Sequence, residues 1–214
     1  MRFTTGDDGR PIPAERWDRQ YRDGRWQFLD SPEEFAHYRA VAGYIRRCSS
    51  FPTLLDAGCG HGRLAELLAQ GSYRSYLGVD FSGEAIAQAA RLAGKRVRFR
   101  IADLNRWRPR RRFSVIVFCE SLNYAIHPVA TLRDYVGALE PGGSIVVSLY
   151  RHPNHERIWT DAAAFFRTIH ASVVTDGRTR SWRVSVLQPK AAAVRRRPLC
   201  PCLIPGAHSR YSGG

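Results

Sequence analysis

The fold of this chain is decided by residues 54–64, which read Leu-Leu-Asp-Ala-Gly-Cys-Gly-His-Gly-Arg-Leu. The stretch starts as the end of an apolar strand, passes three glycines at alternate positions and continues as a helix. Glycine has no Cβ, so it adopts unusual backbone angles and lets a ligand approach the main chain. We therefore expect a ligand-binding turn between a strand and a helix.

The next strand, residues 75–80, ends in Asp80. A carboxylate in this position is suited to accepting hydrogen bonds from both hydroxyls of a ribose. The glycines at positions 58, 60 and 62 form G-x-G-x-G, whereas dinucleotide-binding turns use G-x-G-x-x-G. Asp56 precedes them, and its carboxylate would repel a phosphate but attract an ammonium group.

The order D-x-G-C-G-x-G, then V-D-x-S, resembles the class I S-adenosylmethionine-dependent methyltransferases. The resemblance implies an α/β fold, Rossmann-like and doubly wound, with a seven-stranded, mostly parallel sheet and an antiparallel C-terminal hairpin. It also implies S-adenosylmethionine as the cofactor and S-adenosylhomocysteine as its product. The alternatives are a nicotinamide or flavin domain, or a tight turn without a ligand.

In the resembling family, the glycine turn lies against the methionine part of the cofactor, and acids after the next two strands bind ribose and adenine. The cofactor-binding residues implied here are Asp56, Gly58, Gly60, Gly62, Asp80, Phe81, Ser82, Asp103, Leu104 and Glu120. Asp103 would accept a hydrogen bond from the adenine amino group. For this residue the alternative is a helix cap or a turn.

Residues 17–26 read Trp-Asp-Arg-Gln-Tyr-Arg-Asp-Gly-Arg-Trp. They resemble the W-D-x-x-Y-x-x-G-x-W leader of several small-molecule methyltransferases, which covers the cofactor as a lid. The resemblance implies that Tyr21 and Trp26 close the site, where aromatic faces would also attract a sulfonium. The alternative is that both rings anchor a helix to the core.

Residues 119–128 follow the fourth strand of the alternation and read Cys-Glu-Ser-Leu-Asn-Tyr-Ala-Ile-His-Pro. They lack the N/D-P-P-Y/F motif of enzymes that methylate amino groups of nucleic acids. The Glu-x-Leu-x-Tyr element is similar to that of small-molecule methyltransferases, including the nodulation protein S type, which methylates an amino sugar. Methyl transfer needs an amine acceptor to be neutral, or a base within hydrogen-bond reach of a hydroxyl acceptor. The catalytic candidates are Glu120, Tyr124 and His127. His127 has the alternative of capping the next helix; His152 and His155 are weaker candidates.

The chain has 214 residues, of which 44% are hydrophobic, enough for one α/β domain. We expect a flexible leader over residues 1–16, a single domain over 17–188 with lid helices over 17–47, and a disordered basic tail over 189–214. The start of the chain has no apolar signal-peptide core, which favours a cytoplasmic protein. No cysteine spacing indicates a metal site.

Five strands are expected between residues 53 and 150, alternating with helices. Residues 96–101 alternate charged and apolar side chains, which is typical of a strand at a sheet edge. We expect a helix over 158–171, followed by strands at 172–175 and 182–187 on either side of a glycine turn.

The net charge is +14, and eight of the positive charges follow Asp176, the last acid of the chain. A second basic cluster, residues 106–112, precedes an apolar strand. These residues leave an RNA methyltransferase as an alternative function. No aromatic residues are interleaved as a stacking platform, so we favour solvated surface and expect a small-molecule acceptor, without a nucleic-acid or membrane partner. A non-catalytic binding module is the other alternative, because cofactor motifs certify binding and not chemistry.

Overall fold

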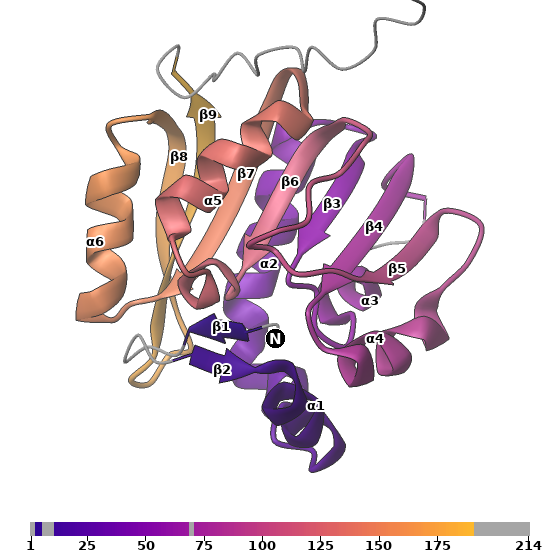
Figure 1. Ribbon diagram of the computed structural model, residues 1–214. Coiled ribbons are helices and arrows are strands. Elements are labelled where there is room, and N and C mark those ends of the chain that lie inside the picture. Colours follow the sequence, from indigo (N-terminus) through magenta and orange to yellow (C-terminus); the bar gives the residue numbers. More distant parts are fainter. Residues whose placement is uncertain (1–2, 6–10, 69–70, 191–214) are drawn as a thin grey trace, which may run out of the picture.

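The computed structural model describes residues 3–5, 11–68 and 71–190. A seven-stranded sheet in the order β5-β4-β3-β6-β7-β9-β8 forms its centre (Figure 1). Its strands are β3 (Thr53–Ala57), β4 (Ser75–Asp80), β5 (Val97–Ile101), β6 (Phe113–Cys119), β7 (Leu139–Tyr150), β8 (Phe166–Thr175) and β9 (Ser181–Pro189). Only β9 runs against the other six strands. The predicted mostly parallel sheet with its antiparallel C-terminal hairpin is therefore confirmed, and β5 lies at the expected edge.

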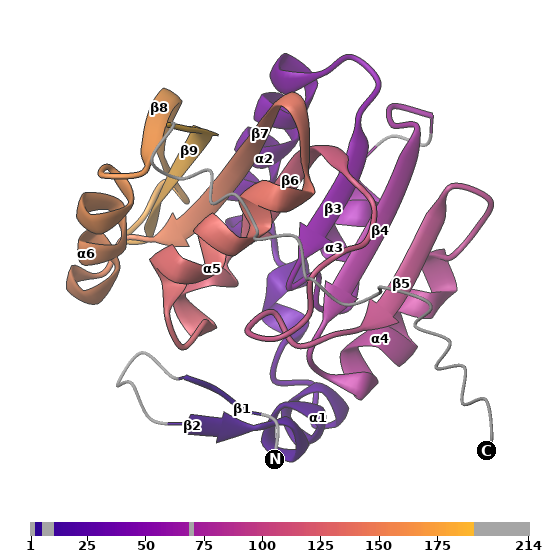
Figure 2. The same ribbon diagram turned by 45° about the horizontal axis from the view of Figure 1, so that its top comes forward.

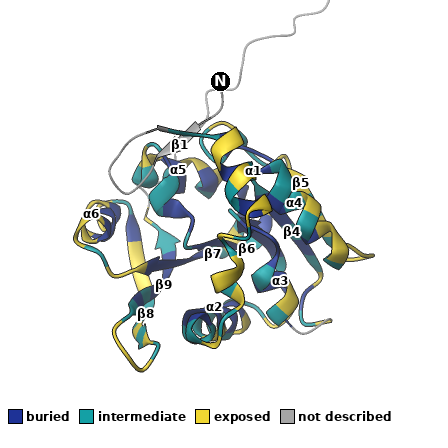
Figure 3. Ribbon diagram, turned by 90° about the horizontal axis from the view of Figure 1, so that it is seen from below, coloured by how far each residue is buried: buried dark blue, intermediate teal, exposed yellow. Residues whose placement is uncertain are grey.

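Helices cover both faces of the sheet, so its middle strands are buried. The helices are α2 (Phe35–Cys48), α3 (Arg63–Leu67), α4 (Gly83–Ala89), α5 (Pro128–Tyr135) and α6 (Pro153–Ala162). Successive side chains of β6 alternate between the faces: Val115 and Val117 pack with α2 and α3, whereas Ile116 and Phe118 pack with α5 and α6. Exposed residues gather on the outer sides of the helices and on the β8–β9 turn (Figure 3).

The N-terminal residues lie beyond the carboxyl ends of the parallel strands (Figure 2). They form β1 (Phe3–Thr5), β2 (Pro11–Pro13), α1 (Ala14–Arg22) and two short 3-10 helices, η1 (Gln27–Asp30) and η2 (Pro32–Glu34). The expected flexible leader thus contains a small antiparallel strand pair and the first turn of α1. Extended Pro13 precedes that turn and Glu15 lies within it, where a negative charge stabilises the helix. We call residues 14–34 the lid segment. Of the lid helices expected over residues 17–47, α2 instead packs on the sheet, and a lid over the cofactor stays a prediction.

The prediction of a helix over residues 158–171 is wrong in its second half. Pro153 takes the first helical position and the His152 ring accepts a hydrogen bond from the backbone of Asn154, so α6 begins early and ends at Ala162. Residues from Phe166 onward pair with β9 as strand β8. From Ile169 onward its side chains alternate between more and less exposed positions, and β-branched Thr168 and Ile169 suit a strand. The strand hairpin is therefore longer than expected.

The other strand boundaries lie close to their expected positions, except that β7 already begins at Leu139, with a register shift opposite Phe113 and Val115. At the other end of the chain, β9 runs through Pro189, and the backbone of Lys190 donates a hydrogen bond to Phe165. The rest of the predicted disordered tail lies outside the described residues. Within the described ranges, no helix is both long enough and apolar enough to cross a membrane.

Candidate active site

A cavity of about 290 Å³ lies at the carboxyl ends of β3, β4 and β6, beneath the lid segment. In an open α/β sheet this is where ligands bind. Nine of the predicted site residues line it: Tyr21, Trp26, Gly58, Gly60, Asp80, Phe81, Leu104, Glu120 and Tyr124. Asp56, Gly62, Ser82, Asp103 and His127 do not. Most of the predicted site is thus brought together by the fold.

The three glycines have positive φ angles of 86°, 54° and 91°, which only glycine adopts readily. A Cβ at Gly58 would lie 2.3 Å from the Ser121 Cβ, and one at Gly60 would lie 2.8 Å from the Tyr21 hydroxyl oxygen. Both positions border the cavity. Gly62 instead lies against Leu92, where a Cβ would come within 2.9 Å of the Leu92 Cδ1. A glycine at position 62 therefore allows the start of α3 to pack closely against Leu92.

Asp80 ties the glycine turn to the end of β4. Its two carboxylate oxygens accept hydrogen bonds from the backbone N–H groups of Gly60 (2.8 Å) and Ser82 (2.9 Å). Each oxygen keeps a second lone pair for a ligand. Burial raises the pKa of Asp80 above its usual value, although these hydrogen bonds oppose the shift.

Ser82 was expected among the cofactor-binding residues, but its side chain is fully buried and holds the start of α4. Its hydroxyl oxygen accepts a hydrogen bond from the backbone of Ala85, 3.1 Å away, and its hydroxyl donates to Asp18 at 2.5 Å. Asp18 also accepts from the backbone of Glu84 at 3.1 Å. Asp18 therefore helps to cap α4, which ties α1 to the start of that helix.

Asp56 is 1% exposed and faces the core, not the cavity. One of its carboxylate oxygens accepts a hydrogen bond from the Tyr76 hydroxyl, and the other is buried without a partner among the described residues. Burial raises the pKa of Asp56 to about 7, and the Tyr76 hydrogen bond limits that rise. A carboxylate that points into the core cannot hold the methionine end of a ligand directly.

Asp103 lies in a turn after β5. One carboxylate oxygen accepts hydrogen bonds from the backbone and the side-chain amide of Asn105, at 2.9 and 3.0 Å. Its neighbours Leu104 and Asn105 line the cavity. Asp103 thus fixes the turn that carries Leu104 and Asn105. Its contact with adenine stays a prediction.

Aromatic rings of the lid segment form one wall of the cavity. Trp26 stacks on Trp17 with ring centroids 5.1 Å apart, and on Tyr21 at 5.8 Å. Tyr124 meets Trp17 edge-on at 4.9 Å. The Trp26 indole Nε1 is buried and has no hydrogen-bond partner among the residues that the structure describes. A buried donor normally has one, so Trp26 fits a site that a polar ligand completes.

Glu120 has a φ angle of 52°, the only positive φ of a non-glycine residue among those that the structure describes. Such backbone is sparsely populated and is typical of functional sites. The Glu120 carboxylate accepts hydrogen bonds from the Ser148 hydroxyl (2.7 Å) and the backbone of Tyr150 (2.8 Å). Burial raises its pKa, whereas nearby His37 and these hydrogen bonds lower it.

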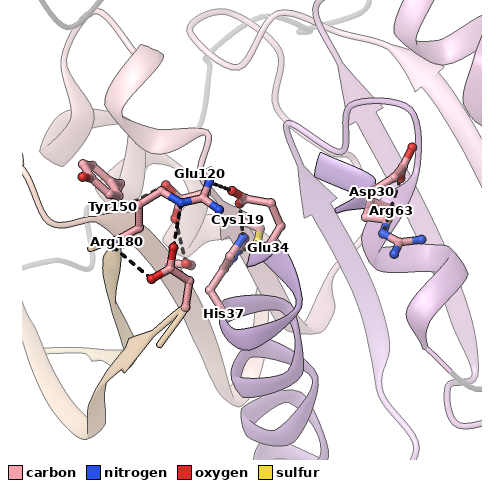
Figure 4. Close-up of polar contacts among 10 residues, drawn as sticks. Asp30, Glu34, His37, Arg63, Cys119, Glu120, Tyr150 and Arg180 are labelled. Atoms are coloured by element: carbon pink, nitrogen blue, oxygen red, sulfur yellow. Dashed lines mark hydrogen bonds and ion pairs between the residues drawn. The ribbon is translucent and has the colours of Figure 1, made fainter. Parts of the chain in front are cut away.

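A second polar group beside Glu120 was not expected from the sequence. Figure 4 shows Glu34, His37 and Arg180 meeting where α2 approaches the sheet, while Asp30 and Arg63 form a separate contact. One oxygen of Glu34 pairs with His37 at 2.9 Å and the other with Arg180. Further lining residues that the sequence analysis did not select are Trp17, Phe28, Leu29, Tyr38, Cys59, His61, Asn105, Cys119, Ser121, Asn123, Ala125, Tyr150 and Trp182.

Of the candidate histidines, the weaker candidate His155 lines the cavity, whereas the stronger candidate His127 does not. His127 is exposed and lies outside the cavity, directly before Pro128. No hydrogen bond from its side chain caps α5. His155 is 5% exposed, lines the cavity and hydrogen-bonds the Tyr150 carbonyl oxygen at 2.8 Å.

The basic cluster of residues 106–112 is largely engaged with the protein itself. Arg108 donates to the carbonyl oxygens of Leu104 and Trp107 and pairs with Asp134. Arg111 lies over the Phe113 ring. These contacts favour a structural role for the cluster. Among the described residues, no three His, Cys, Asp or Glu side chains are grouped to hold a metal ion.

The family described as "Methyltransferase domain" matches residues 18–183. Trans-aconitate 2-methyltransferase from Pseudomonas paraeruginosa (strain DSM 24068 / PA7) is 33% identical over 111 residues. That match covers 51% of this chain and only 38% of the relative's length.

Solved structures share the fold at low sequence identity. N-methyltransferase NodS from Bradyrhizobium japonicum WM9, in complex with S-adenosyl-L-homocysteine, has a TM-score of 0.71 at 16% identity, covering 82% of this chain and 97% of NodS. The 1,6-didemethyltoxoflavin-N1-methyltransferase from Burkholderia thailandensis has a TM-score of 0.64 at 22% identity, covering 82% and 86%. It was solved with 1,6-didemethyltoxoflavin and S-adenosylhomocysteine bound.

Proposed function

The chain belongs to the methyltransferase domain family, and we propose that it methylates a nitrogen or oxygen atom of a small molecule, a sugar or a natural-product intermediate. The expectation of a class I, S-adenosylmethionine-dependent methyltransferase is confirmed by the family match and by the fold. The main support for a small-molecule acceptor is one cavity of about 290 Å³ that extends from Asp80 to Glu120 beneath the aromatic residues of the lid segment. Such a concave, largely aromatic space is typical of small-molecule sites.

The residues of the Asp80 side fit S-adenosylmethionine, which supplies a methyl group on a positively charged sulfur. Asp80 offers free lone pairs to the ribose hydroxyls, and the backbone at Gly58 and Gly60 borders the cavity without side chains. Trp26 adds an unsatisfied buried N–H donor and an aromatic face. Aromatic faces attract cations, so Tyr21 and Trp26 would stabilise the sulfonium.

The residues of the Glu120 side would hold the acceptor. β3 lies between β4 and β6, so Asp80 and Glu120 stand on opposite sides of the glycine turn. Glu120 has a carboxylate that can accept a proton, and Tyr124 connects this side to the lid through Trp17. Holding acceptor and methyl donor close and in line lowers the barrier of a displacement.

The names of the compared proteins agree with this acceptor class. Trans-aconitate and 1,6-didemethyltoxoflavin are both small molecules. NodS is described as an N-methyltransferase. The match to the trans-aconitate enzyme covers little of that protein, so its substrate is not transferred to this chain.

The proposal is tested by incubating the full chain with methyl-labelled S-adenosylmethionine and a fractionated cell extract. We expect label in the small-molecule fraction, and none in RNA or protein. Heat-denatured chain is the matched control. Label that appears only in RNA would contradict the proposal and favour the RNA alternative.

A further inference from the structure

The charged residues on the Glu120 side of the cavity indicate the chemical class of the acceptor. This inference rests on the proposed function. Three carboxylates line the cavity: Glu34, Asp80 and Glu120. Asp80 lies on the proposed cofactor side. Glu34 is neutralised by Arg180 and paired with His37, at 2.9 Å from the His37 ring nitrogen. Glu120 differs from both, because it lies on the proposed acceptor side and pairs with no arginine among the described residues.

Glu120 is held only by uncharged donors in the contacts that the structure gives. Its oxygens accept from the Ser148 hydroxyl at 2.7 Å and the Tyr150 backbone at 2.8 Å. His37 lies near enough to influence it, but the His37 ring bonds to Glu34 and faces Cys119 at 3.7 Å. A largely desolvated carboxylate that accepts hydrogen bonds only from uncharged groups is costly. A ligand that brings a positive charge would remove that cost.

The arginines of the cavity are already committed to acids. Arg180 pairs with Glu34 and, at 3.0 Å, with Asp176. Arg63 pairs with Asp30 at 3.4 Å and with Glu66 at 2.7 Å. Among the described residues that line the cavity, these two arginines are the side chains that carry a positive charge at every physiological pH. An anionic acceptor would meet no unpaired arginine and would face Glu120, so the charges disfavour a carboxylate substrate.

Aromatic side chains line the same cavity as the Glu120 carboxylate. Tyr38, Tyr150 and Trp182 line this end of the cavity. Trp182 meets Tyr150 edge-on at 6.0 Å and stacks on His37 at 4.9 Å, which fixes its ring. Aromatic walls around an acid are suited to a cation carried on an apolar or ring-shaped body.

We propose that the acceptor is a small primary or secondary amine, which enters as an ammonium ion and is bound and deprotonated by Glu120. The ammonium proton passes to the Glu120 carboxylate and leaves the nitrogen lone pair free. The nitrogen–methyl bond then forms as the methyl–sulfur bond breaks, and the bonding electrons remain on sulfur as a neutral thioether. The product is a methylated ammonium ion, and Glu120 releases its proton to solvent.

The titratable neighbours of Glu120 set the pH at which this works. They are Glu34, His37 and Tyr38 on the α2 side and Cys119 on its own strand. Glu34 and burial raise the pKa of Glu120 above its usual value, and His37 lowers it. Binding of an ammonium ion should weaken as falling pH protonates Glu120.

The test compares three probes that share one ring: 2-phenylethylamine, 2-phenylethanol and phenylacetate. Each is titrated into the full chain saturated with S-adenosylhomocysteine at pH 7, and tryptophan fluorescence reports binding near Trp182. We expect the amine to bind at least tenfold more tightly than the alcohol or the carboxylate. Equal or tighter binding of either other probe, or no saturable binding of the amine at millimolar concentration, would overturn the inference.

Two variants assign the preference to Glu120. Glu120→Gln should lower amine affinity at least tenfold and change alcohol affinity less than threefold. Ser148→Ala removes one hydrogen bond but keeps the carboxylate, so it should retain the amine preference. If Glu120→Gln binds S-adenosylhomocysteine and still prefers the amine, Glu120 is not the recognising group. Failure of the folded wild type to bind S-adenosylhomocysteine would instead overturn the proposed function.

Discussion

Asp80→Ala is expected to weaken binding of S-adenosylhomocysteine at least tenfold, or about 1.4 kcal/mol. Two effects add in this variant. The ribose loses a charged acceptor, and a hydrogen bond to a charged group contributes roughly 1.5–3 kcal/mol. The backbone N–H groups of Gly60 and Ser82 also lose their partner, so the glycine turn loosens. Calorimetric titration of wild type and variant measures the difference.

A matched control separates the local effect from a general change of charge. Asp134 is another acid; it is exposed on α5, pairs with Arg108 and does not line the cavity. Asp134→Ala should bind S-adenosylhomocysteine within twofold of wild type. Equal affinities of Asp80→Ala and wild type would exclude Asp80 from the ribose site.

Asp56→Asn is expected to change how stability depends on pH. Folding raises the pKa of Asp56 from 3.8 to about 7, because burial disfavours the charged form. The folded state therefore binds more protons than the unfolded state between these values. Wild type should lose stability as pH rises from about 4 to about 7, by up to about 4 kcal/mol from this group, and then level off.

Asparagine does not ionise, so the variant should lack this component. Its oxygen can still accept the hydrogen bond from Tyr76. We expect its stability relative to wild type to improve steadily from pH 4 to pH 7, as measured by denaturant unfolding at each pH. Glu120, whose pKa is also raised, remains in both proteins and cancels in the difference, whereas Asp80 raises the pKa of Asp56 and is part of the effect measured. Parallel stability curves for the two proteins would contradict a raised Asp56 pKa.

Local motifs predicted the residues that line the Asp80 side of the cavity. The glycine turn and Asp80 lie within one strand–helix–strand unit, so their mutual position follows from the order of the elements. The edge position of β5 followed from its alternating arginines, Arg98 and Arg100. Asp56 was misplaced because a motif specifies the position of a residue, whereas strand pleat directs its side chain into the core.

The acceptor half was not predictable in the same way. Glu34 and Arg180 are 146 positions apart and meet only because α2 and the β8–β9 turn lie at the same end of the sheet. In the sequence, Glu34 is typical of a helix start and Arg180 of a polar turn. His155 was underrated because its position depends on where α6 begins, which the sequence pattern placed five residues late.

The most direct test of the whole site is hydrogen–deuterium exchange of the full chain with and without S-adenosylhomocysteine. The account predicts slower exchange in residues 17–31, 57–64, 79–83 and 119–125, which carry the lid, the glycine turn, Asp80 and Glu120. Residues 166–175 of β8, away from the cavity, should exchange at an unchanged rate. Protection confined to other segments, or no protection at saturating ligand, would contradict the assignment of this cavity as the methyltransferase site.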